Sequence, residues 1–247
     1  MNCFCSVCQS SNSKNQRTRA SIFISTARGK KFLIDTSPDL RMQYLKNKLS
    51  PPDGVFITHD HADHLHGIDD LRPFSFRQKA MDLYTSTETA NLIKERFSYI
   101  FAQKNQKVGG GIPLIDMHEV SIGEEEIIEE SESFLFYLLP HHHTKTLGIV
   151  HEKKMAYFID CNSIPTKTLN ALKSFNLELL IIDCVRRAPH QTHLNLDKAL
   201  QYANEIQAKK TVFTHLSHDF DHQELSNELK KYDSTFFPAY DGQLISY

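Results

Sequence analysis

The 247-residue sequence has no long run of apolar residues and little net charge. No stretch approaches the roughly 18 apolar residues that a membrane-spanning helix needs. The formal net charge of −2 creates no global field that would recruit nucleic acid or an anionic membrane. The N-terminus lacks the apolar core of a signal peptide, because polar residues follow Cys3-Phe4-Cys5 at once. We therefore expect a soluble, cytoplasmic protein that does not bind a membrane, and its charge balance does not favour nucleic acid as a partner.

The sequence also lacks the even set of cysteines that is typical of a secreted disulfide scaffold. It has five, of which Cys161 and Cys184 lie in apolar segments and are interpreted as small buried side chains. The other three crowd together as Cys3-x-Cys5-x-x-Cys8. This pattern favours a soft metal site that lacks its fourth ligand. The alternative is a reduced, frayed terminus.

The most informative stretch packs three imidazoles and two carboxylates into seven residues. It reads Thr58-His59-Asp60-His61-Ala62-Asp63-His64 and follows an apolar segment, 54–57, that predicts a strand. Four of the groups have the spacing H-x-H-x-D-H, and a loop that leaves a strand can aim several such side chains at one point. Neutral imidazole with carboxylate suits zinc, manganese or iron(II). The alternative is an exposed His-rich loop. A solvated surface would, however, be expected to carry Lys and Glu rather than clustered His and Asp.

The rest of the chain predicts one α/β domain over residues 1–247. A hydrophobic content of 40% with 16 Phe supports a substantial core. A β-hairpin is expected over residues 21–35, and the polar segment 103–111 is expected to be a flexible loop. Further strands are predicted at 81–84, 134–139, 147–150, 155–159, 179–182 and 211–213. Helices are predicted at 39–48, 87–97, 165–175, 196–206 and 223–230.

The H-x-H-x-D-H motif resembles the metallo-β-lactamase superfamily, a group of metal-dependent hydrolases. The resemblance spans essentially the whole chain and implies a four-layer αββα sandwich. Members of the related branch begin with a strand and a Gly- and Ser-rich turn before the first of the clustered cysteines. This sequence starts at Met1-Asn2-Cys3, so we expect that first N-terminal strand to be missing.

The superfamily takes further ligands from the ends of later strands. In the run Pro140-His141-His142-His143-Thr144-Lys145, the pattern of phosphodiesterase relatives selects His143, with His142 as the alternative. Asp160 ends a predicted strand, and the resemblance makes it the carboxylate that bridges two metals, although it is also in place to cap the next helix. His215 follows the 211–213 strand, where the superfamily has its final ligand.

A later segment resembles the part of these enzymes that carries a substrate-side histidine. By position, His193 is expected to act as a general acid or to contact phosphate, and His190 is the weaker candidate or a turn residue. Arg186 and Arg187 are candidates for contact with an anionic substrate, although exposed arginines are common.

The branch that contains the phosphonate-pathway cyclic phosphodiesterase (phosphoribosyl 1,2-cyclic phosphate phosphodiesterase) offers the most specific link. In that branch a C-x-C-x-x-C segment and a His three residues past the last catalytic ligand hold a structural zinc. Cys3, Cys5, Cys8 and His218 match this pattern. We therefore expect a structural zinc that joins the two ends of the chain.

Taken together, the resemblance implies two divalent ions, zinc or manganese, at a dinuclear active site. The implied ligands are His59, His61 and His143 for one metal and Asp63, His64 and His215 for the other, with Asp160 between them; Asp63 and His193 are the catalytic residues. We expect a phosphodiesterase that cleaves a small cyclic phosphate or nucleotide-like phosphodiester by metal-bound hydroxide. The alternatives are a thioester or lactone hydrolase, a tRNA-processing nuclease, and a non-catalytic metal-binding module. The sequence leaves a homodimer open.

Overall fold

The computed structural model describes residues 2–75, 80–101 and 111–247, which form two compact units. The first unit is Arg19–Glu132, and the second is Met1–Thr18 together with Ser133–Tyr247. The prediction of one domain over residues 1–247 stays a prediction. The predicted loop 103–111 lies outside the described residues except for Gly111. No helix in the described ranges is long and apolar enough to cross a membrane.

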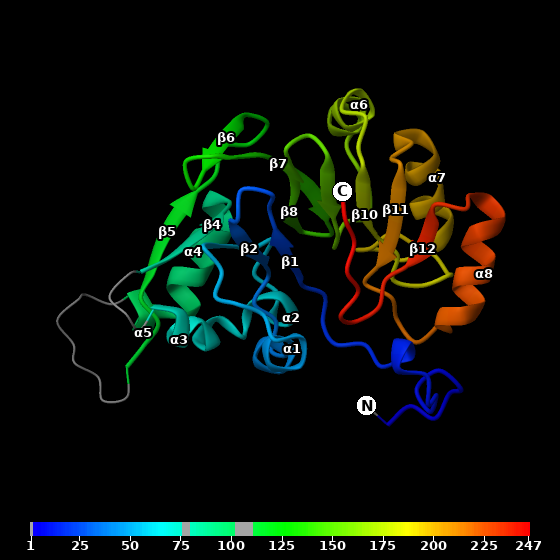
Figure 1. The fold of residues 1–247 in the computed structure, drawn as a ribbon, viewed down its shortest axis with the longest axis horizontal. Coiled ribbons are helices and arrows are strands. Elements are labelled where there is room, and N and C mark those ends of the chain that lie inside the picture. Colours follow the sequence, from blue (N-terminus) through cyan, green and yellow to red (C-terminus); the bar gives the residue numbers. More distant parts are fainter. Residues whose placement is uncertain (1, 76–79, 102–110) are drawn as a thin grey trace. The chain divides into compact units, whose positions relative to one another are not determined.

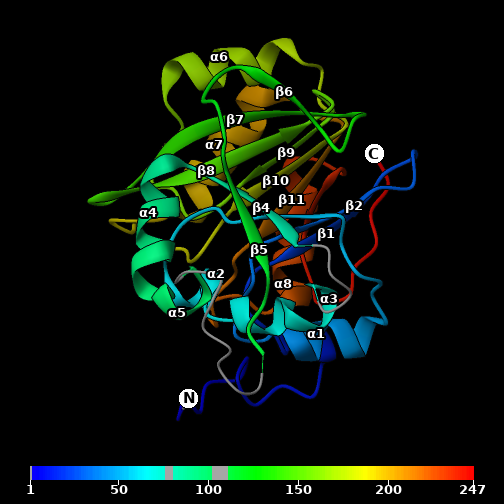
Figure 2. The same cartoon turned by 90° about the vertical axis from the view of Figure 1, so that its left-hand side faces the viewer.

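The first unit is built on a mixed sheet with the strand order β1-β2-β3-β4-β5. Strands β1 and β2 are antiparallel, and the remaining neighbours are parallel. Helix α4 lies beside β5 (Figure 2) and begins at Ser86, whose hydroxyl accepts a hydrogen bond from the Thr89 amide. The strands are β1 (Ile22–Ser25), β2 (Lys31–Ile34), β3 (Gly54–Phe56), β4 (Met81–Thr85) and β5 (Ile115–Glu119), and β6 (Glu125–Ile128) follows them in the chain. The helices are α1 (Leu40–Asn47), α2 (Ala62–Leu65), η2 (Ile68–Leu71), α3 (Arg72–Ser75), α4 (Thr87–Arg96) and α5 (Ser98–Phe101).

The second unit has a larger mixed sheet with the order β12-β11-β10-β9-β8-β7. Helices α6, α7 and α8 flank it (Figure 1), and the apolar faces of α7 and α8 join the main core of the unit. The strands are β7 (Glu132–His141), β8 (Thr144–His151), β9 (Met155–Phe158), β10 (Leu179–Asp183), β11 (Lys210–Thr214) and β12 (Phe236–Pro238). The helices are η1 (Ser13–Asn15), α6 (Thr166–Ser174), α7 (Leu196–Ile206) and α8 (His222–Tyr232).

Strand direction brings several chain positions to one edge of this second sheet. Strands β9, β10 and β11 are parallel, and β7 points the same way because both β7 and β9 are antiparallel to β8. The carboxyl ends of four strands therefore meet at one edge, where ligands of open α/β sheets usually bind. His141, Asp160, Asp183 and His215 lie at or just beyond these four ends.

The α/β class and most predicted elements are confirmed. The hairpin, the strands near 54, 81, 179 and 211, and all five helices are present, with ends shifted by one or two residues. Strands β5, β6 and β12 were not predicted, and β7 extends two residues past its predicted end at Leu139. That extension decides which histidine of the 141–143 run belongs to the strand.

Candidate metal centre

In the first unit, the H-x-H-x-D-H loop gathers its side chains tightly. The loop leaves β3 and ends in the short helix α2, so His64 is drawn into the core while His61 stays at the surface. The ring centroids of His59 and His61 lie 4.5 Å apart, and those of His59 and His64 lie 4.5 Å apart. A carboxylate oxygen of Asp63 lies 3.5 Å from His64 Nε2. The four predicted ligands of this unit are thus brought together.

A buried carboxylate that was not singled out in the sequence holds this loop. Asp35 follows β2, is 0% exposed, and has a left-handed backbone (φ 66°). It accepts hydrogen bonds from the Thr58 amide (2.8 Å), the Thr58 hydroxyl (2.9 Å) and His64 Nδ1 (2.8 Å). Burial raises the pKa of Asp35, while His64 and Thr58 act to lower it. Gly67 lets the loop approach closely, because a Cβ there would lie 2.1 Å from the Ser37 carbonyl oxygen.

In the second unit, Asp160 lies at the centre of a second cluster. His141, Asp160 and His193 have ligand atoms within 4.8 Å of one another. His193 Nδ1 lies 3.2 Å from Asp160 Oδ1, and His215 Nε2 lies 3.7 Å from Asp160 Oδ2. Asp160 and His215 both have left-handed backbones (φ 50° and 60°), which cost energy for residues other than glycine and recur at functional sites.

Asp183 supports the second cluster as Asp35 supports the first. It ends β10, is fully buried, and lies 3.0 Å from His215 Nδ1. Its other oxygen accepts the Leu194 amide at 3.0 Å and lies 3.4 Å from His193 Nδ1. Asp183 therefore fixes the orientation of His215 and the chain segment that carries His193.

The structure brings to the second cluster a histidine other than the one predicted. His141, the last residue of β7, is buried beside Asp160, whereas His142 and His143 lie exposed in the turn, with their rings edge to face and the centroids 3.6 Å apart. The His142 backbone is left-handed (φ 56°), which begins the turn. The geometry thus favours His141 over both predicted alternatives. The sequence signal that points to it is its place directly after an apolar strand.

Four histidines share a feature that suits metal binding. In each, Nδ1 faces an acceptor: Thr58 Oγ1 for His59 (3.0 Å), Asp35 for His64, the Thr192 carbonyl for His141 (3.0 Å) and Asp183 for His215. This contact fixes the proton on Nδ1 and leaves the Nε2 lone pair for a cation, as in metal-binding histidines generally. With Asp63 and Asp160, the donor set fits zinc, manganese or iron(II).

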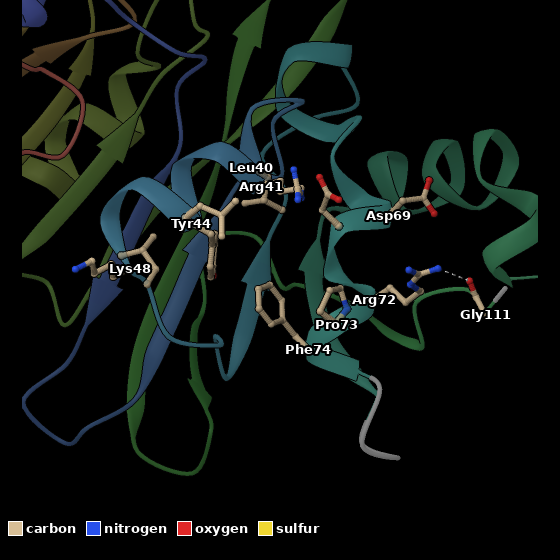
Figure 3. A pocket seen from close by; sticks show the side chains of 12 residues that line it. Leu40, Arg41, Tyr44, Lys48, Asp69, Arg72, Pro73, Phe74 and Gly111 are labelled. Carbon is tan, nitrogen blue, oxygen red and sulfur yellow. Dashed lines mark hydrogen bonds between the residues drawn. The ribbon is translucent and has the colours of Figure 1, made fainter.

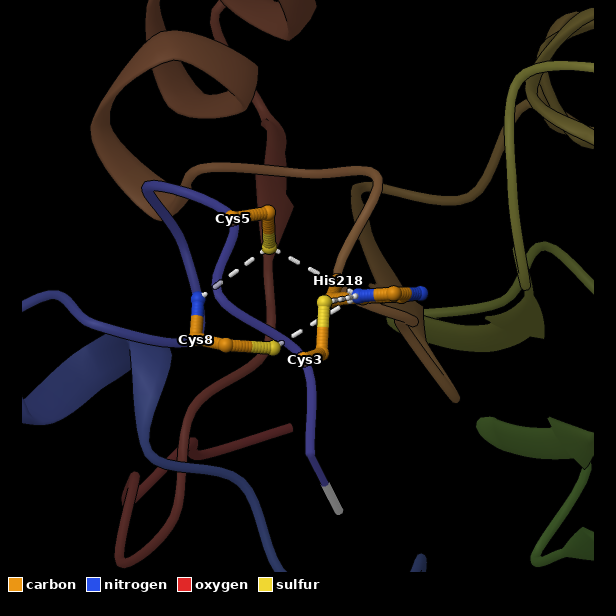
Figure 4. A group of neighbouring side chains, drawn as sticks. All are labelled: Cys3, Cys5, Cys8 and His218. Carbon is orange, nitrogen blue, oxygen red and sulfur yellow. Dashed lines mark hydrogen bonds between the residues drawn. The ribbon is translucent and has the colours of Figure 1, made fainter.

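The N-terminal cysteines and His218 also come together, as predicted from the two ends of the chain (Figure 4). His218 Nδ1 lies 3.2, 3.6 and 3.5 Å from the sulfurs of Cys3, Cys5 and Cys8. Tetrahedral zinc, with Zn–S about 2.3 Å and Zn–N about 2.0 Å, places nitrogen and sulfur ligands about 3.5 Å apart. The Cys8 amide lowers the pKa of Cys5 to about 6, which favours the thiolate that binds metal. The four side chains fit a structural zinc.

A polar network ties this cysteine segment to the loop that follows β11. Arg17 donates to the carbonyls of Ser217 (2.9 Å) and Phe220 (2.8 Å). Asn15 donates to Asp221 at 2.7 Å. The loop that carries His218 is therefore fastened to the N-terminal segment independently of any metal.

A cavity of about 840 Å³ lies in the first unit, between α1 and the η2–α3 segment (Figure 3). Tyr44, Phe74 and Leu40 are among its walls, and Arg72 at its rim donates to the Gly111 carbonyl at 3.3 Å. No predicted metal ligand is among its described lining residues. The cavity is therefore not part of the His/Asp clusters.

Comparison with known proteins identifies the family. A family model described as "Beta-lactamase superfamily domain" matches residues 30–216, about three quarters of the chain. The chain belongs to the metallo-β-lactamase superfamily. It has the α/β fold of that superfamily, with two mixed sheets flanked by helices.

Two solved structures illustrate the likeness. A protein described as a new diphosphatase from the PhnP family is 34% identical, with a TM-score of 0.87, covering 98% of this chain and 89% of that one. Zn²⁺-bound PqqB from Methylobacterium extorquens is 16% identical, with a TM-score of 0.77, covering 100% of this chain and 94% of that one. The second match supports the fold alone.

A curated relative from Porphyromonas gingivalis (strain ATCC BAA-308 / W83), named octanoyltransferase, is 33% identical over 221 residues. These residues cover 87% of this chain but 42% of the relative. The chain thus spans less than half the length of that protein. The superfamily match and the His/Asp clusters together support a hydrolase of the metallo-β-lactamase fold.

Proposed function

We propose that this protein is a dinuclear metal-dependent phosphodiesterase that acts on a small phosphodiester or diphosphate ester. The main support is the shared orientation of His59, His64, His141 and His215, whose Nδ1 atoms all face acceptors. Residues that served only to fill a core would have no reason to present four imidazole Nε2 atoms in the same protonation state.

We assign the ligands in two sets and replace one predicted member. His59, His61 and His141 would hold one metal, and Asp63, His64 and His215 would hold the other. Asp160 would be a ligand shared by the two sets. The replacement of His143 by His141 rests on the short distances among His141, Asp160 and His193. A structural zinc at the cysteine cluster completes the proposed metal content, three ions per chain.

Bound divalent metal would supply a nucleophile at neutral pH and neutralise charge on the phosphoryl group. The protein's own contribution is positioning and proton transfer. His193 Nδ1 lies near the carboxylates of Asp160 and Asp183, at 3.2 and 3.4 Å, which favours a proton on this atom. An imidazole so held between two carboxylates suits the donation of a proton from Nε2 to the leaving oxygen.

The substrate class draws support from the relative described as a diphosphatase, which is 34% identical over nearly the whole chain. A thioester or lactone hydrolase is the second candidate. The observation that favours it is the curated relative named octanoyltransferase, of which this chain spans 42%. Both reactions use the same ligands, so only a substrate assay separates them.

The test is turnover of bis(p-nitrophenyl) phosphate by zinc- or manganese-loaded protein. The same protein is assayed with p-nitrophenyl octanoate and an octanoyl thioester, which test the second candidate. Metal content is measured by mass spectrometry on the same samples. We expect phosphodiester hydrolysis that is abolished in His61→Ala and Asp160→Ala, together with loss of metal. Protein that holds its full metal content and hydrolyses no phosphodiester above background would overturn the proposal. Ester or thioester hydrolysis alone would establish the second candidate.

A further inference from the structure

The segment between β10 and α7 is a rigid loop built by its own polar contacts. Val185 and Leu194 pair through the backbone, with a nitrogen–oxygen distance of 3.0 Å, and so do Leu196 and Arg186. The Arg186 guanidinium donates to the carbonyls of Ala188 (3.2 Å) and Pro189 (2.6 Å). These bonds fix the backbone immediately before His190. The loop therefore holds the backbone positions of His190 and His193 fixed, so that these are not freely moving surface side chains.

Thr192 determines which nitrogen of His190 carries the proton. The Thr192 amide donates to His190 Nδ1 at 3.2 Å, so Nδ1 is the acceptor. The Thr192 hydroxyl lies 3.1 Å from the same atom. A neutral imidazole whose Nδ1 accepts a hydrogen bond has its proton on Nε2. His190 thus has the opposite tautomer to the four proposed ligands His59, His64, His141 and His215, and it offers a donor instead of a lone pair.

The histidine rings of the second unit form a row that leads away from the proposed ligands. The ring of His193 lies 5.0 Å from those of His141 and His215. The ring of His190 lies 4.8 Å from that of His193. His190 is therefore one ring further out than the residue that we expect at the leaving oxygen.

The electrostatic surroundings of His190 suit an anion. Burial lowers its pKa, and the positive charges of His193 and Arg186 lower it further. The imidazole is accordingly neutral near pH 7, with a donor N–H and a guanidinium nearby. Arg187 is not available in the same way, because it forms a two-point ion pair with Glu228 at 2.9 and 2.6 Å.

We infer that His190 is a specificity-determining residue, whose Nε2–H binds an anionic oxygen on the leaving-group side of the substrate, next to the group contacted by His193. This inference rests on the proposed function. It narrows the substrate class to phosphodiesters whose leaving group itself bears a negative charge, as a diphosphate diester does. Arg186 is a positioning residue that holds the loop and adds positive potential.

The experiment compares two substrates in three variants. ADP-ribose places a second anionic phosphoryl group beside the one attacked. In bis(p-nitrophenyl) phosphate, the p-nitrophenyl leaving group carries no charge while it is bonded to phosphorus. For His190→Ala we expect kcat/KM on ADP-ribose to fall about tenfold or more, mainly through KM, and to fall at most about threefold on bis(p-nitrophenyl) phosphate. His190→Asn, which keeps an N–H donor, should recover part of the loss. Arg187→Gln is the matched control and should change neither value.

The outcomes distinguish this inference from the proposed function. An equal fall on both substrates in His190→Ala, or wild-type protein that cleaves bis(p-nitrophenyl) phosphate but not ADP-ribose, would overturn the role of His190. Wild-type protein that is fully metal-loaded and cleaves neither would overturn the phosphodiesterase itself. Metal content and the melting curve of His190→Ala should match those of the wild type, since its hydrogen bonds and ring contact are with Thr192 and His193, neither of which is a proposed metal ligand.

Discussion

Replacement of Asp35 by alanine should destabilise the protein far more than any surface carboxylate would. The change leaves the Thr58 amide and His64 Nδ1, both completely buried, without their acceptor. The Thr58 hydroxyl also loses the acceptor of its proton, because His59 Nδ1, 3.0 Å away, is itself a donor to this hydroxyl. Each buried donor without a partner costs about 1–3 kcal/mol, and removing one member of a buried charged pair costs about 3–5 kcal/mol. We expect a loss of about 3–5 kcal/mol.

The matched control is Asp39→Ala. Asp39 lies in the same unit and accepts from Arg19 at 3.0 Å, but both side chains are partly exposed, so this pair should contribute about 1 kcal/mol or less. Urea unfolding of metal-free protein, followed by circular dichroism, measures both variants without a contribution from bound metal. A difference between the two of under about 1 kcal/mol would refute our account of Asp35. In metal-loaded protein, Asp35→Asn should weaken metal binding by about 10–100-fold through His64.

Three further predictions concern the metal ligands and the proton donor. His141→Ala should remove metal and activity, while His143→Ala should leave metal content near that of the wild type. The reverse result would favour His143, the ligand predicted from the sequence. His193→Ala should lower turnover by about 10²–10⁴-fold with both catalytic metals retained, and loss of those metals would contradict its role as a donor. Cys5→Ser should remove one zinc and lower the melting temperature. Because protons compete with zinc for the thiolates, this zinc should be released as the pH falls.

The first-unit cluster could be read from the sequence because its ligands are local. The spacing of His59, His61, Asp63 and His64, after an apolar strand, is itself the motif, and the loop needs no distant residue to bring them together. The pairing of the cysteines with His218 is not local, and it came from resemblance to one branch of the family.

The choice among three adjacent histidines could not be made from spacing. Neighbouring residues of a strand face opposite sides, so the answer depends on where β7 ends, and only the pairing of His141 with Thr144 on β8 shows this. The supporting carboxylate Asp35 was missed because its partners are 23 and 29 residues away. Strand β5 escaped notice although Ile115-Asp116-Met117-His118 alternates, because the run is short and three of its five residues are exposed.

The fastening of the N-terminal segment by Asn15 and Arg17 has a practical consequence for anyone who purifies this protein. Arg17 donates to the carbonyls of Ser217 and Phe220, which lie on either side of His218, and Ser217 is two residues after His215. A change in the first eighteen residues can therefore shift the nearby backbone of His215, a proposed metal ligand. A polyhistidine tag placed ahead of Cys3 would add competing imidazoles beside the thiolates, so a tag at the other end is the safer choice for assays of metal content.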